Sequence, residues 1–112
     1  MARGASLAVS HMVRIDEELK AARAAKAAIN ALSTATPKSA TLATLGRANH
    51  VAILNLSNGG ALNGARANVG IALSNLLHGH GPPTQERIDK AKPAIEAWIM
   101  ELENYMAQIG VI

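Results

Sequence analysis

The residues that follow Thr84 carry the most constraining pattern in the chain. Apolar side chains recur there at alternating spacings of three and four residues, at Ile88, Ala91, Ile95, Trp98, Leu102, Tyr105 and Ile109. Only a helix brings residues at this spacing onto one face, and Thr84 is a good helix N-cap residue. Pro93 lies off the apolar stripe, so it predicts a kink within one helix rather than two separate helices. The sequence therefore predicts a long amphipathic helix after Thr84.

The same spacing marks three earlier segments, which we expect to be helices over about 13–32, 37–58 and 61–77. Their apolar stripes are Ile15, Leu19, Ala22, Ala25, Ile29 and Leu32; then Leu42, Leu45, Asn49, Ala52 and Leu56; then Leu62, Ala65, Val69, Ala72 and Leu76. Residues 33–37, the pair Gly59–Gly60 and residues 78–83 interrupt them, and the 23 alanines favour helix throughout. In this interpretation Thr36 caps the second helix. Four helices of similar length with short connections predict an all-α, up-down-up-down four-helix bundle.

The first twelve residues are expected to lie outside this bundle. Residues 1–12 read as a leader, partly left over from cloning at Ser10-His11-Met12, and residues 13–112 as a single four-helix domain.

The chain has no cysteine and no apolar run of about 18 residues, so disulfides and a membrane-spanning helix are excluded. We expect a cytoplasmic protein of bacterial or phage origin.

The middle of the chain carries very little charge. The 47 residues from Ser39 to Gln85 hold two formal charges, Arg47 and Arg66, and have apolar side chains off the main stripes. A helix in a lone bundle normally keeps a charged outer face. We therefore expect a second copy to cover this segment, most simply in a dimer that completes or extends the bundle, with an interface that includes Asn49, Val51, Leu54 and Leu73. The alternative is an exposed, weakly polar surface.

Charge is unevenly distributed along the rest of the chain. The net charge is +3; cations predominate in the first two thirds, and the last 20 residues carry only acidic groups, Glu96, Glu101 and Glu103. One interpretation is that the acidic helix neutralises its basic neighbours. The alternative is a nucleic-acid-binding bundle that uses Arg14, Lys20, Arg23, Lys26, Lys38, Arg47 and Arg66. Six cations spread over residues 19–85 form no dense cluster, and with no Phe, one Trp and one Tyr we do not expect a nucleic-acid surface built on stacked aromatic side chains.

Reactive side chains are few. His78 and His80, two residues apart, are weak candidates for a metal site, because a stable site needs further ligands and none lies nearby in sequence. No catalytic motif is recognisable, so no catalytic residue and no cofactor is predicted. We expect a non-enzymatic interaction or assembly protein that self-associates and presents a helical surface to an unknown protein partner. The alternatives are the nucleic-acid-associated bundle and a bundle that binds a metal or a small ligand.

Overall fold

In the residues that the structure describes, the chain forms four helices and no strand. The computed structural model describes residues 2–34, 39–56, 62–78 and 83–108, with side chains in the first helix described from Met12 onward. The helices are α1 (Ala2–Ala31), α2 (Ser39–Asn55), α3 (Asn63–Leu77) and α4 (Gln85–Gln108). The predicted all-α four-helix fold is confirmed.

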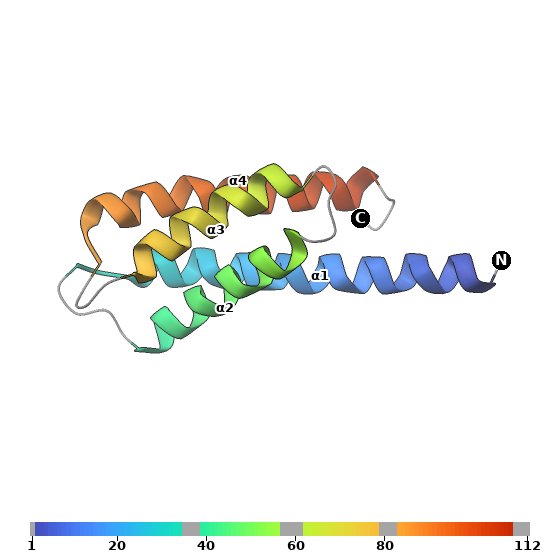
Figure 1. Ribbon diagram of the computed structural model, residues 1–112, viewed down its shortest axis with the longest axis horizontal. Coiled ribbons are helices and arrows are strands. Elements are labelled where there is room, and N and C mark those ends of the chain that lie inside the picture. The colour runs from blue at the N-terminus through green and yellow to red at the C-terminus, as the bar shows by residue number, and fades with distance from the viewer. Residues whose placement is uncertain (1, 35–38, 57–61, 79–82, 109–112) are drawn as a thin grey trace.

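The helices run alternately up and down around one core (Figure 1). Each packs against two neighbours, in the order α1–α2, α2–α3, α3–α4 and α4–α1, so α1 lies diagonally across from α3 and α2 across from α4. The molecule measures 54 × 23 × 22 Å. Its long dimension reflects α1, because 30 residues of helix span about 45 Å and its N-terminal part projects beyond the other helices. None of the described helices is long and apolar enough to span a membrane.

The helix boundaries differ from the sequence prediction mainly in α1. This helix begins at Ala2 rather than near Val13, because residues 2–12 contain three alanines and no proline and so do not interrupt it. Helix α2 is described from Ser39 onward and α3 from Asn63 onward, and the predicted starts at Pro37 and Ala61 lie outside the described residues. The predicted cap at Thr36 and the break at Gly59–Gly60 lie outside the described residues.

The start of α4 follows the prediction. The Thr84 hydroxyl accepts a hydrogen bond from the backbone N–H of Arg87 at 3.3 Å, which is the N-cap interaction expected from the sequence. Pro93 is exposed and lies within one uninterrupted helix rather than between two.

All six apolar stripe residues predicted for the first helix, from Ile15 to Leu32, are buried in the core.

The core stripes of α2 and α3 are rotated from the predicted ones. In α3 the buried positions are Leu62, Arg66, Val69, Gly70, Leu73 and Leu76, so Ala65 and Ala72 lie on the flank. In α2 they are Leu45, Ala48, Ala52 and Asn55, so Asn49 and Leu56 lie on the flank. The rotation brings Arg66 and Asn55, two polar residues, into the centre of the bundle.

Candidate functional site

Side chains from three helices meet inside the bundle at a single carboxylate of the remaining helix. We call Glu18 (α1), Asn55 (α2), Arg66 (α3) and Trp98 (α4) the Glu18 cluster. The exposed fractions of these four residues are 0%, 6%, 3% and 0%, in the same order. A charged pair buried this completely is unusual in a soluble domain and requires full hydrogen bonding.

Both oxygens of the Glu18 carboxylate are fully hydrogen-bonded. Oε1 accepts from Arg66 Nη2 at 2.7 Å and from Asn55 Nδ2 at 3.1 Å. Oε2 accepts from Arg66 Nε at 2.9 Å and from Trp98 Nε1 at 2.8 Å. The guanidinium thus grips the carboxylate through two N–H groups, the strongest geometry for this pair. Four donors occupy the four acceptor positions of the carboxylate.

Arg66 also stabilises the end of α2. Its Nη1 donates to the backbone carbonyl of Asn55 at 3.2 Å, and Asn55 is the last residue of that helix. Carbonyls in the last turn of a helix have no partner within the helix, and a cation suits the negative end of the helix dipole. The Arg66 side chain of α3 therefore neutralises the Glu18 carboxylate of α1 and also binds a carbonyl at the C-terminal end of α2.

The arrangement of the Glu18 cluster suits a structural role. Protein side chains provide four donors to the carboxylate, and the cluster is buried. A reacting group needs access to a substrate, whereas this carboxylate is saturated. Because the Glu18 carboxylate of α1 is bonded to one side chain from each of the other three helices, the cluster specifies how the helices are aligned along the bundle axis.

The Glu18 cluster was not predicted from the sequence, although the sequence contains a signal for it. Glu18 continues the 3/4 spacing of α1 between Ile15 and Ala22, and Arg66 does so in α3 between Leu62 and Val69. One acid and one base, each within an otherwise apolar stripe, indicate a buried pair. The alternative prediction of a nucleic-acid surface had instead placed Arg66 among the exposed cations.

A second notable region is the outward side of α2 and α3. We call it the α2/α3 face; its exposed or half-exposed residues include Ala43, Gly46, Arg47, His50, Ile53, Leu54, Gly64, Ala67, Asn68, Ile71, Ser74 and Asn75. Because Arg66 is buried, Arg47 is the one formal charge on these two helices that reaches this face. Ile53, Leu54 and Ile71 are 48%, 61% and 63% exposed.

An apolar groove runs between the two helices of this face. It has a volume of about 400 Å³ and is lined by Ile53, Leu56, Ala67, Gly70, Ile71, Ser74 and Asn75. Gly70 opens the groove, since a Cβ there would lie 3.4 Å from Cγ1 of Ile53. The Ser74 hydroxyl lies 3.5 Å from Asn49 Oδ1 and links the two helices next to it.

The four residues predicted at an interface fall in different environments. Leu54 is exposed on the α2/α3 face, and Asn49 is half-buried beside the groove. Val51 is half-buried against the core of its own chain. Leu73 is completely buried in that core, so it is not available to a second copy.

The residues of the nucleic-acid alternative are only partly brought together: Lys20 of α1 and Arg47 of α2 line one hollow, which also contains Glu17. Arg66 is bonded to Glu18 in the core, so its inclusion among the surface cations was wrong, and Lys38 lies outside the described residues. Arg14, Lys20, Arg23 and Lys26 are exposed on α1, and Arg47 is exposed on α2.

Two of these α1 cations lie beside acidic groups. Lys20 Nζ lies 3.1 Å from Asp16, which raises the pKa of the Lys20 amine through a hydrogen bond and its charge. Arg23 lies 3.6 Å from Glu103 of the acidic end of α4. The latter contact agrees with the expectation that this end neutralises basic neighbours.

The histidine loop is only partly described. His78 is exposed at the C-terminal end of α3, and His80 lies outside the described residues. Within the described part of the chain, no three His, Asp or Glu side chains are grouped as metal ligands would be.

Comparison of the chain with protein-family models, curated proteins and solved structures gave no match. The assignment of a function therefore depends on the geometry of this chain alone.

Proposed function

We propose that this chain is a non-enzymatic assembly protein that associates with a second copy of itself through the α2/α3 face. The observation that carries the proposal is the exposure of Ile53, Leu54 and Ile71 on a face that has one formal charge. Exposed apolar side chains gathered on a nearly uncharged surface are typical of protein interfaces. In keeping with this role, the protein would act in the cytoplasm.

A second copy suits this face better than a charged partner. In a two-fold dimer both copies use the same surface. A charged side chain near the two-fold axis therefore lies opposite the same charge of the other copy. The α2/α3 face brings only Arg47 into such a contact, whereas the exposed sides of α1 and α4 carry many charges. Self-association is thus least opposed by repulsion on this face. The groove beside Gly70 offers room for an apolar side chain of the partner copy.

The mass of the protein in solution tests the proposal. Light scattering and sedimentation across a wide range of concentrations are expected to give a species of twice the 11.6 kDa of one chain. Ile71→Glu and Leu54→Glu would each place a charge in the contact. Since both side chains are more than half exposed, the variants are expected to stay helical while dimerisation weakens by at least about tenfold.

Two further variants serve as controls. Met100 on α4 is 55% exposed and lies outside the α2/α3 face, so Met100→Glu should leave the mass unchanged. Leu73 is fully buried, so Leu73→Glu should unfold the chain instead of yielding a folded monomer. A wild-type chain that is monomeric at all concentrations would contradict the proposal, as would equal effects of Ile71→Glu and Met100→Glu.

A further inference from the structure

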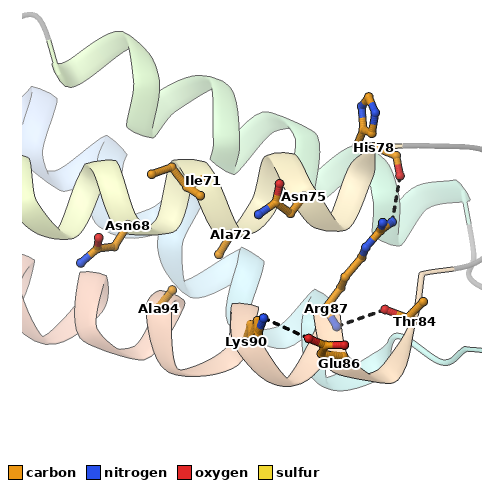
Figure 2. Close-up of a pocket in the computed structure, with 10 residues that line it drawn as sticks. All are labelled: Asn68, Ile71, Ala72, Asn75, His78, Thr84, Glu86, Arg87, Lys90 and Ala94. Carbon is orange, nitrogen blue, oxygen red and sulfur yellow. Dashed lines mark hydrogen bonds and ion pairs between the residues drawn. The ribbon is translucent and has the colours of Figure 1, made fainter.

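A cavity of about 630 Å³ lies between α3 and α4 (Figure 2). It forms because small side chains, Ala72 of α3 and Ala94 of α4, lie on the walls where the two helices adjoin. Its volume falls within the range of about 300–1,000 Å³ that is typical of sites for small molecules. It borders the α2/α3 face at Ile71 and Asn75 but extends away from that face toward α4.

One end of the cavity carries a positioned cation. Arg87 reaches from α4 across to α3, where its Nη1 donates to the backbone carbonyl of His78 at 3.2 Å (Figure 2). This bond fixes the orientation of the guanidinium at the edge of the cavity. A guanidinium has five N–H groups, and the contact with His78 uses one of them, so others remain to bind a carboxylate side by side.

The other charges in the cavity largely cancel. Lys90 Nζ lies 3.0 Å from the Glu86 carboxylate, and the two form an ion pair one turn apart on α4. The balance of these three charged side chains is therefore one positive charge, provided by Arg87. An anion is favoured over a neutral or cationic ligand at this end of the cavity.

Away from Arg87 the cavity has a mixed lining. Ile71, Ala72 and Ala94 provide apolar surface, and the amides of Asn75, beside Ala72, and Asn68, at the far end, provide polar surface (Figure 2). From Arg87 to Ala94 is seven residues of helix, which corresponds to about 10 Å along the axis. The cavity thus combines an anion-binding end with a length of two helical turns on which Ile71, Ala72 and Ala94 form an apolar strip between the polar Asn75, Asn68 and Lys90.

We propose that this cavity binds a small organic acid, a monocarboxylate with a short apolar tail. The carboxylate would bind the Arg87 guanidinium, and the tail would lie between Ala72 and Ala94. Inorganic anions satisfy only the first of these contacts and leave the apolar walls in water. The cavity shares Asn68, Ile71 and Asn75 with the α2/α3 face, whereas Arg87 and Ala94 on α4 lie outside that face.

Titration of the full chain with octanoate, observed by amide chemical shifts, tests this site. Saturable shifts are expected in α3 and α4 around Ala72 and Ala94. Octanamide has the same tail without the charge, and phosphate has charge without a tail. Octanamide loses the charge-assisted hydrogen bonds to Arg87, and phosphate loses the burial of the tail. Each of these contributions is larger than the free energy that corresponds to a tenfold change in affinity, so each ligand is expected to bind at least about tenfold more weakly than octanoate.

Variants of Arg87 separate this site from nonspecific binding of a fatty acid. Arg87 is exposed, so Arg87→Gln should fold normally while its affinity for octanoate falls about tenfold and its affinity for octanamide does not change. Arg87→Lys should bind with intermediate affinity, since it keeps the charge but not the two-pronged geometry. Lys92→Gln removes one charge from α4 at a residue that does not line the cavity, and it should bind like the wild type.

Three results would overturn the proposal. The first is the absence of saturable octanoate binding. The second is shifts confined to the apolar groove around Ile53 and Gly70. The third is a loss of affinity in Lys92→Gln as large as that in Arg87→Gln, which would indicate only a general attraction between the anion and a basic protein.

Discussion

Replacement of Glu18 by glutamine is expected to be among the most destabilising single changes in this protein. In the native cluster two oxygens accept four hydrogen bonds. Glutamine keeps one oxygen and places an NH₂ group against two N–H donors, so at least two of these bonds are lost. The Arg66 guanidinium, only 3% exposed, then has no counter-charge.

The size of the effect follows from the burial. Removal of one partner of a buried ion pair costs about 3–5 kcal/mol, because the other charge stays desolvated. A domain of this size has a free energy of unfolding of about 5–15 kcal/mol. A loss of this size would lower Tm by roughly 12–20 °C, at about 4 °C for each kcal/mol. Urea unfolding followed by circular dichroism measures the free energy directly.

A matched control and a double variant make the test specific. Glu86→Gln removes the same charge from an exposed pair with Lys90 and should cost under about 0.5 kcal/mol. Glu18→Leu with Arg66→Met removes both buried charges, so its cost should be smaller than the sum of the two single changes by about 2 kcal/mol or more. Some cost remains, because Trp98 Nε1 and Asn55 Nδ2 lose their acceptor.

Two outcomes would refute this reasoning. If Glu18→Gln costs under about 1 kcal/mol, the pair behaves as an exposed one and the cluster is open to water. If the single costs of Glu18→Leu and Arg66→Met simply add in the double variant, the two side chains do not interact in solution.

Three further changes should alter stability, each measurable by urea unfolding. Gly46→Ala should stabilise the protein by about 0.5–1 kcal/mol, because alanine is the better helix former and nothing lies within 4 Å of the added Cβ; a loss would indicate a contact there in solution. Trp98→Phe should cost about 2–3 kcal/mol, since Glu18 loses a donor and the smaller ring leaves space; an unchanged midpoint would contradict the bond. Thr84→Ala should cost about 1 kcal/mol through loss of the α4 cap, and no cost would argue against that cap.

The sequence predicted those features of the fold that depend on residues close together in the chain. Spacings of three and four residues identified four helices, and the Thr84 cap placed the start of α4. The α1 stripe from Ile15 to Leu32 was also correct, because the large apolar side chains there leave one choice of buried face.

The buried faces of α2 and α3 were harder to predict, because alanines occur on several sides of these helices and suit either a buried or an exposed position. In α3 both Ala65 and Arg66 continue the spacing from Leu62, and the apolar residue was the natural choice from sequence alone. The correct choice depends on Glu18, which lies 48 residues away and on the diagonally opposite helix. Similarly, the cavity beside Arg87 depends on how closely α3 and α4 approach, which residue spacing does not specify.

The division of the Glu18 cluster between the two halves of the chain has a consequence for how the protein unfolds. The α1–α2 pair supplies Glu18 and Asn55, and the α3–α4 pair supplies Arg66 and Trp98. Separation of the two pairs breaks the bonds from Arg66 and Trp98 to Glu18 and exposes the apolar core sides of all four helices, so a half-opened molecule is disfavoured. The chain should therefore open as one cooperative unit, and the slowest-exchanging backbone amides of all four helices should share a single opening free energy.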